Sequence, residues 1–148
     1  MKSKIINLNS NNIKIITRSL LIGKTIVIPT DTVYGIAADA KSFQGVENIF
    51  KIKKRPKRFP LILFTHSIAE AKKLALFSPF EEYLASKYWP GPLTLVAKVK
   101  NKSICKSALS KMNTIAVRVP SNTIFLNILS KLKIPLAAPS ANRYGKIS

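Results

Sequence analysis

The chain has 148 residues, 47% of them hydrophobic, and its 25 Lys and Arg against 6 Asp and Glu give a formal charge of +19. This length and apolar content fit one folded domain and exclude a disordered tail. The charge favours polyanionic partners such as nucleotides, RNA or anionic surfaces, although lysines scattered along a chain are a weaker sign of a nucleic-acid site than a clustered arginine stripe.

Apolar periodicity predicts helices at residues 12–22, 43–55, 67–76, 79–88 and 121–132, and strands at residues 25–28, 60–64, 93–99, 114–119 and 134–138. The expected N-caps are Asn11 or Asn12 for the first helix, Ser42 for the second and Ser121 for the last. Residues 100–112 are polar and receive no assignment. Strands that alternate with helices predict a single-domain α/β fold over residues 1–148, and prolines within the strands favour a twisted mixed sheet over a strictly parallel one.

The first candidate site follows the strand at residues 25–28. There Thr30, Asp31, Thr32 and Tyr34 bring polar side chains to the end of an apolar run, and Gly35 allows the backbone to turn or to approach a ligand. Open α/β sheets build ligand sites at such strand ends. The alternative is a hydrogen-bonded turn that caps a helix through Asp31 or Thr32.

The second candidate is the basic segment at residues 53–58, with five cations in six residues. Lys53 and Arg55 suit phosphate groups, because lysine offers a mobile point charge and arginine a planar fork. The alternative is a solvated basic face at a helix C-terminus, where cations also stabilise the helix dipole.

Two further candidates end predicted strands. Ser140 and Asn142 supply short donors and acceptors, or else form a simple cap or turn. Arg118 interrupts an apolar strand. It either points to solvent by alternation or faces a cleft as a clamp for a carboxylate or phosphate.

Other chemistries find little support. His66 and Cys105 have no helper residues, and one cysteine excludes both an intrachain disulfide and a cysteine-based zinc site. Asp31 and Asp39 could form a carboxylate pair, but six acidic residues are too few for a protein-built metal cage, so no metal site is expected. The sequence contains neither a P-loop nor a GxGxxG fingerprint.

Taken together, five segments closely resemble the YrdC/Sua5 family of L-threonylcarbamoyladenylate synthases. They are residues 29–35, residues 53–56 followed by Pro60-Leu61, residues 89–94, residues 117–120 and residues 138–142. They occur in the family's order and approximate spacing, so together they are far more specific than any one of them. The resemblance covers nearly the whole chain.

The resemblance implies a YrdC-like fold with a basic concave cavity and a nucleotidyltransferase reaction. L-threonine, bicarbonate and ATP are condensed to threonylcarbamoyladenylate with release of pyrophosphate, for the t6A modification of tRNA. It implies that Lys53 and Arg55 are catalytic and, with Ser140 and Asn142, bind the nucleotide. Thr30, Thr32, Tyr34 and Arg118 would line the threonine pocket. Mg²⁺ is expected to arrive with ATP, and a tRNA threonylcarbamoyl transferase complex is an expected downstream partner.

The resemblance also implies strands and helices beyond Ser148, so a domain truncated at its C-terminus is expected. A double-stranded RNA- or tRNA-binding module without catalysis, and an inactive truncated remnant, remain as alternative functions. No apolar run reaches transmembrane length and no signal peptide is recognisable, so a cytoplasmic protein without membrane contact is expected.

Overall fold

The computed structural model describes residues 4–7, 10–109 and 111–147. Its helices are α1 (Ser10–Leu21), α2 (Phe43–Lys53), α3 (Ile68–Leu74), α4 (Pro79–Tyr88), α5 (Thr123–Leu132) and the short 3-10 helix η1 (Lys106–Ala108). Its strands are β1 (Ile26–Ile28), β2 (Gly35–Asp39), β3 (Ile62–Phe64), β4 (Ala75–Leu76), β5 (Leu95–Val99), β6 (Thr114–Arg118) and β7 (Leu136–Ala137).

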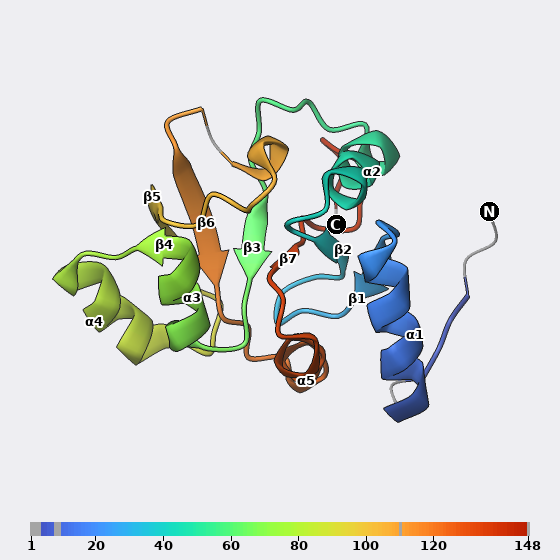
Figure 1. The fold of residues 1–148 in the computed structure, drawn as a ribbon, viewed down its shortest axis with the longest axis horizontal. Coiled ribbons are helices and arrows are strands. Elements are labelled where there is room, and N and C mark those ends of the chain that lie inside the picture. Colours follow the sequence, from blue (N-terminus) through green and yellow to red (C-terminus); the bar gives the residue numbers. More distant parts are fainter. Residues whose placement is uncertain (1–3, 8–9, 110, 148) are drawn as a thin grey trace.

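The seven strands form a single sheet in the order β1-β2-β7-β3-β6-β5-β4 (Figure 1). Among the described strands, β3 and β6 pair in parallel and the other neighbouring strands are antiparallel. The predicted mixed α/β sheet is therefore confirmed. The parallel pair places the ends of β3 and β6 side by side, with Phe64 opposite Arg118.

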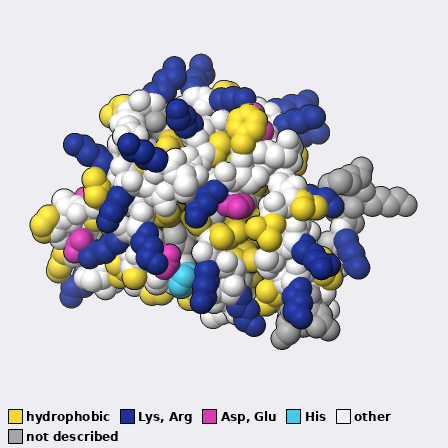
Figure 2. All heavy atoms as spheres, viewed as in Figure 1, with side chains coloured by type: hydrophobic (Ala, Val, Ile, Leu, Met, Phe, Trp, Pro, Cys, Tyr) yellow, Lys and Arg dark blue, Asp and Glu magenta, His cyan; other side chains and the backbone are white. Residues whose placement is uncertain are grey.

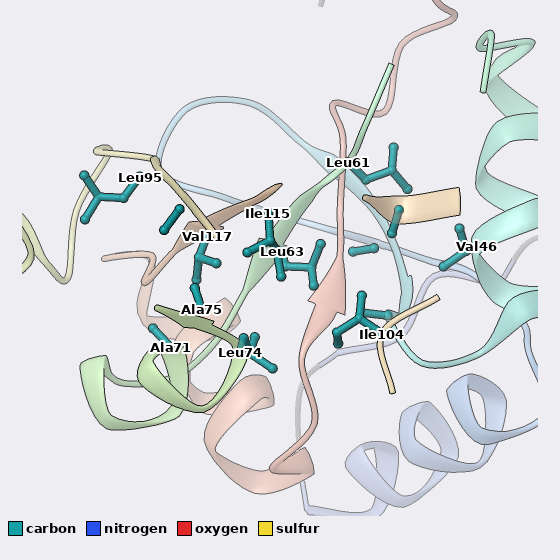
Figure 3. Packing of buried hydrophobic residues seen from close by; sticks show 14 of the residues in the cluster. Val46, Leu61, Leu63, Ala71, Leu74, Ala75, Leu95, Ile104, Ile115 and Val117 are labelled. Atoms are coloured by element: carbon teal, nitrogen blue, oxygen red, sulfur yellow. The ribbon is translucent and has the colours of Figure 1, made fainter. Parts of the chain in front are cut away.

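Neighbouring residues of a strand point to opposite sides of the sheet, so apolar side chains lie on both faces. Helices cover both of these faces. On one face Leu63 packs in a cluster with residues of α2, α3 and α4. Figure 3 shows part of this cluster, with Leu63 and Val117 from the central strands near Leu74 of α3. On the other face Phe64 and Leu136 pack with residues of α1 and α5, and the Phe64 and Phe125 rings lie 5.0 Å apart.

Side-chain caps fix where several helices begin. The predicted cap of α2 is confirmed, since Ser42 Oγ accepts a hydrogen bond from the Gly45 amide at 3.0 Å. The prediction of Ser121 as the cap of α5 was wrong by one residue. Asn122 Oδ1 instead accepts from the Phe125 amide at 3.0 Å. Helix α1 begins at Ser10, ahead of both predicted caps, and the residue that precedes it lies outside the described part of the chain.

The structure corrects the predicted elements in two further places. The predicted helix at residues 67–76 ends at Leu74, and Ala75–Leu76 forms β4, an edge strand paired with β5. Strand β2 was not predicted, because Gly35–Asp39 is rich in alanine and has little of the β-branched character by which strands are recognised. Within the unassigned residues 100–112 the chain forms η1, whose Ala108 carbonyl oxygen accepts a hydrogen bond from the Leu61 amide at 3.0 Å.

The end of α2 follows the prediction. Lys54 caps the helix in the left-handed region at φ 52°, and the Arg55 amide still donates to the Phe50 carbonyl at 3.0 Å. A left-handed residue at this point reverses the chain direction. Lys53 therefore remains on the helix facing the interior, while Arg55 begins the loop that leads to β3.

Candidate active site

The turn between β1 and β2 is organised by one hydroxyl group. Thr30 Oγ1 accepts hydrogen bonds from the amides of Thr32 and Val33, both at 3.2 Å, and donates to the Val33 carbonyl at 2.5 Å. The turn leads into a strand, so the alternative that Asp31 or Thr32 caps a helix was wrong. The Thr32 and Tyr34 side chains remain exposed, and Tyr34 is 65% exposed.

Backbone contacts join this turn to the segment that follows β7. The Ile36 amide donates to the Pro139 carbonyl at 3.0 Å, and the Ala141 amide donates to the Tyr34 carbonyl at 2.7 Å. Between these two bonds, Ser140 forms an isolated antiparallel bridge with Gly35. The first and last of the predicted site segments therefore lie side by side.

Lys53 reaches the same segment from α2. Its side chain is buried, with the residue 3% exposed, and its Nζ donates hydrogen bonds to the carbonyl oxygens of Ser140 and Asn142. The Tyr144 amide donates back to the Lys53 carbonyl at 3.0 Å. For Lys53 the alternative of a solvated basic face was wrong. Burial lowers the pKa of the Lys53 ammonium group, and the neighbouring charge of Arg55 lowers it further.

Arg55 is half-buried beside two stacked aromatic rings. Its guanidinium carbon lies 5.7 Å from the centre of the Phe59 ring and 5.5 Å from that of Tyr144, and the two rings stack 5.4 Å apart. Its Nη2 donates to the Pro60 carbonyl at 3.0 Å. Burial lowers the pKa of Arg55, and the interaction with Tyr144 acts in the opposite direction. Arg55 thus joins the loop before β3 to the last described turn.

Arg118 occupies the end of β6, where it is 6% exposed. It forms an ion pair with Asp31 through Nη2 and Oδ2, and its Nε donates to the Gly91 carbonyl at 2.9 Å. Its guanidinium carbon lies 5.8 Å from the centre of the Phe64 ring. The alternative that Arg118 points to solvent was therefore wrong, and this buried charge is paired, as burial requires.

Gly91 is held in position by the turn at residues 89–93. Trp89 Nε1 donates to the Leu93 carbonyl at 2.7 Å, and the Gly91 amide donates to the Val119 carbonyl at 2.9 Å. A Cβ atom on Gly91 would lie 2.3 Å from the Tyr88 carbonyl oxygen, so only glycine fits there. The turn places one carbonyl oxygen where it accepts a hydrogen bond from Arg118. This contact explains why the segment occurs together with the other predicted site segments.

Asp31 stays ionised in its buried position. Burial raises the pKa of its carboxyl group. The hydrogen bond and the charge of Arg118, with the backbone amides of Asp31 and Ser121, outweigh that effect and hold the pKa below its usual value. The site therefore contains an ionised carboxylate paired with one cation of the predicted set, Arg118.

The structure thus brings together residues from all five predicted segments. Lys53 contacts Ser140 and Asn142 directly, and Arg55 is linked to Lys53 through Tyr144. Asp31 and Arg118 form a second group that the Thr30 turn connects to the first. Asp39 is at the opposite end of β2 from this turn and accepts a hydrogen bond from the Lys41 amide, so the Asp31–Asp39 pair does not form.

Sequence reasoning missed three participants. Asp31 was considered as a polar residue of the candidate turn, as a cap and as half of a carboxylate pair, but not as the partner of Arg118. Gly91 and Tyr144 received no individual role. The signal for Asp31 was available, since an acidic residue inside a candidate anion site of a strongly basic chain calls for a specific reason.

Positive charge is spread over the surface of the molecule. Figure 2 shows Lys and Arg side chains around the whole outline of one face, with few acidic side chains among them. No cluster of three or more His, Cys, Asp or Glu suited to a metal occurs within the described residues. None of the helices in the described part of the chain is long and apolar enough to cross a membrane.

Comparisons with known proteins identify the family to which the chain belongs. Residues 18–148 match the model of the Sua5/YciO/YrdC domain, a family described as "Telomere recombination". The chain belongs to this family. It is 42% identical to the threonylcarbamoyl-AMP synthase of Pyrococcus abyssi over 127 residues, which are 85% of this chain and 37% of the relative. It is 30% identical to a putative threonylcarbamoyl-AMP synthase of Methanocaldococcus jannaschii, with 100% of this chain and 72% of the relative covered.

The fold is that of the same family. A crystal structure of P. abyssi Sua5 complexed with L-threonine superimposes with a TM-score of 0.88 at 38% identity, covering 97% of this chain and 42% of that one. The predicted fold and family resemblance are confirmed. The chain spans about a third of the length of the first curated relatives that it matches.

Proposed function

We propose that this chain synthesises L-threonylcarbamoyladenylate from L-threonine, bicarbonate and ATP and releases pyrophosphate, as a nucleotidyltransferase serving t6A modification of tRNA. The observation that carries the proposal is the convergence of the five segments around two linked groups, Lys53 with Ser140 and Arg118 with Asp31. The family assignment and the threonine complex of the P. abyssi relative support it.

The chemistry requires two anions to meet. The carboxylate of N-carboxylated threonine attacks the α-phosphorus of ATP, and pyrophosphate leaves. Lys53 and Arg55 provide positive potential that offsets the repulsion, and Ser140 and Asn142 position the nucleotide beside them. Mg²⁺ arrives on the triphosphate, consistent with the lack of a carboxylate cluster among the described residues. The reaction calls for no nucleophile from the protein.

Threonine would bind beside the Thr30 turn. Arg118 is the group suited to the substrate carboxylate, because a guanidinium already fixed by Gly91 loses little further freedom on binding. The exposed Thr32 and Tyr34 side chains lie on the same turn and complete the proposed pocket.

The test is pyrophosphate release by this chain, with and without L-threonine and bicarbonate. Release that depends on both substrates is the expected result. The matched variants are Lys53→Ala, which removes the buried cation, and Lys51→Ala, which removes an exposed cation from the same helix. Loss of release in the first variant alone supports the proposal, and release that ignores threonine contradicts it.

Binding of double-stranded RNA or tRNA without catalysis is the second candidate, and the net charge of +19 favours it. Such binding rests on phosphate neutralisation and weakens steeply with salt. RNA binding that is indifferent to threonine and ATP, in a chain that releases no pyrophosphate, would select this candidate over the synthase.

A further inference from the structure

The basic loop, residues 54–60, is attached to the rest of the fold at both ends. Where it leaves α2, the Arg55 amide donates a hydrogen bond to the Phe50 carbonyl at 3.0 Å. Where it enters β3, the Leu61 amide donates to the Ala108 carbonyl of η1, also at 3.0 Å. The middle of the loop is exposed. It therefore needs a contact of its own if the loop is to hold one position.

Glu47, on α2, provides that contact. Its Oε2 pairs with Lys57 Nζ of the basic loop at 2.6 Å, and its Oε1 accepts a hydrogen bond from the Ser107 hydroxyl of η1 at 2.9 Å. The hydrogen bond from Lys57 holds the pKa of the Glu47 carboxyl group below its usual value, against the opposing effect of burial and with support from Ser107. One ionised carboxylate thus joins α2, the basic loop and η1.

This ion pair differs from an ordinary pair on a helix surface. A glutamate in a helix commonly pairs with a cation four residues further along, which is Lys51 here, yet Glu47 pairs with Lys57 in another segment. Only six of the 148 residues are acidic. Among the ion pairs within the described residues, Lys57 is the one cation of the basic loop that has an acidic partner.

The loop needs such an anchor because its cations repel the end of α2. Lys51 and Lys53 lie in the last turn of the helix. Burial lowers the pKa of the Lys53 ammonium group, and the charge of Arg55 lowers it further, which is the effect of one cation on another nearby. Without the carboxylate of Glu47, this repulsion favours an outward shift of the loop, and Arg55 moves with it.

We propose that Glu47 is a positioning residue for nucleotide binding, which pairs with Lys57 to hold the basic loop against α2 and η1 and so keeps Arg55 beside the phosphates of ATP. This inference rests on the proposed function, in which Arg55 acts on the triphosphate. Charge alone predicts the opposite effect, because a carboxylate near a triphosphate weakens its binding. A loss of affinity when this negative charge is removed is therefore the signature of positioning.

The experiment measures the affinities for a non-hydrolysable ATP analogue and for adenosine by titration calorimetry, in the wild type and in Glu47→Gln. The glutamine keeps the length of the side chain and an oxygen for Ser107, but it lacks the charge that pairs with Lys57. Glu82→Gln is the matched control, because it removes the same charge from a 2.8 Å ion pair that links α4 to α3, away from the loop.

Glu47→Gln should weaken binding of the ATP analogue about twofold to fivefold, the effect of a partly exposed ion pair. Adenosine has no phosphates for Arg55, so its affinity should not change. Glu82→Gln should leave both affinities at the wild-type value.

A double variant, Glu47→Lys with Lys57→Glu, keeps the test decisive if Glu47→Gln fails to fold. It restores an ion pair of reversed polarity and places a carboxylate on the loop. Affinity for the ATP analogue within about twofold of the wild type is expected if the pair positions the loop. A much weaker affinity would show that Lys57 itself binds the phosphates, which overturns the inference.

Three other outcomes also overturn it. Tighter binding of the ATP analogue by Glu47→Gln would show that Glu47 withholds Lys57 from the nucleotide. Unchanged binding would show that the loop keeps its position without the pair, and equal losses for the analogue and adenosine would make Glu47 a general support of the fold. A wild type that does not bind the ATP analogue would overturn the proposed function as well, which separates the two failures.

Discussion

The ammonium group of Lys53, at the last residue of α2, donates a hydrogen bond to the carbonyl oxygen of Ser140, which lies 87 residues further along the chain. A second bond from the same group reaches the Asn142 carbonyl. The segment after β7, red in Figure 1, accordingly runs beside α2. Lys53 therefore shapes the backbone that presents Ser140 and Asn142, in addition to contributing charge.

Replacing Lys53 by alanine should abolish synthesis and loosen the segment at residues 139–144. The variant leaves two carbonyl oxygens without their donor, a loss of about 1–3 kcal/mol each when the oxygens stay buried. Because the segment is displaced as a whole, affinity for adenosine should fall together with affinity for ATP. Titration calorimetry with both ligands, and hydrogen exchange at the Tyr144 amide, measure these effects.

The exposed neighbour Lys51 gives the control, since Lys51→Ala removes the same charge without a buried contact. If Lys53→Ala weakened ATP binding and left adenosine binding intact, Lys53 would act on the phosphates directly, and the positioning role described above would be wrong.

Substituting lysine for Arg55 should strongly reduce synthesis although the charge is kept. A lysine cannot bond the Phe59 and Pro60 carbonyls through a planar fork or present a planar guanidinium to the Phe59 and Tyr144 rings. Steady-state pyrophosphate release is the measurement. Arg58→Lys is the matched change, because Arg58 is exposed and contacts a single ring. Equal activity of the two variants would remove Arg55 from the site.

Ser140 is expected to act through its hydroxyl group. The hydroxyl forms no hydrogen bond with the residues that the structure describes, although the Ser140 backbone is fixed by its bridge to Gly35. Ser140→Ala should therefore preserve thermal stability and weaken nucleotide binding by about 1–3 kcal/mol. An unchanged dissociation constant for ATP would exclude the hydroxyl from nucleotide contact.

The sequence was informative about elements whose signals are local. Ser42 with its apolar helix, and the prolines that interrupt the strands, led to the α2 boundary and the mixed sheet. Strand β2 escaped because Gly35–Asp39 is stabilised by pairing with β1 and β7, distant segments that a local pattern does not reveal.

The sequence pointed to the segments of the candidate site but not to their arrangement. Arg118 was left open between solvent and cleft, because alternation alone does not say which face of a strand is covered. Its partner Asp31 lies 87 residues away, and only the folded chain brings the two charges together. The same holds for Tyr144, whose contact with Arg55 depends on the path of the chain after β7.

Acid should destabilise the fold partly through Asp31. Its folded-state pKa lies below the usual value of 3.8, so as the pH falls the unfolded chain takes up the proton first. The stability contributed by the ionised pair is complete well above 3.8 and is lost as the pH falls through the folded-state value. Asp31→Asn should show a shallower loss of unfolding free energy between pH 5 and about pH 3 in urea titrations. A slope equal to that of the wild type would contradict the lowered pKa.

Gly91 links the turn at residues 89–93 to the site, and Gly91→Ala should disturb both. The new methyl group would meet the Tyr88 carbonyl oxygen at 2.3 Å, so the turn has to move and the fold should lose about 1–3 kcal/mol. Because the Gly91 carbonyl holds Arg118 Nε, the displacement should also raise the KM for threonine more than it lowers kcat. Urea unfolding and steady-state kinetics measure the two effects, with Pro92→Ala at the exposed next residue as the control. A destabilised variant with an unchanged KM would show that the position of Arg118 does not depend on Gly91, and that the ion pair with Asp31 alone is enough to hold it.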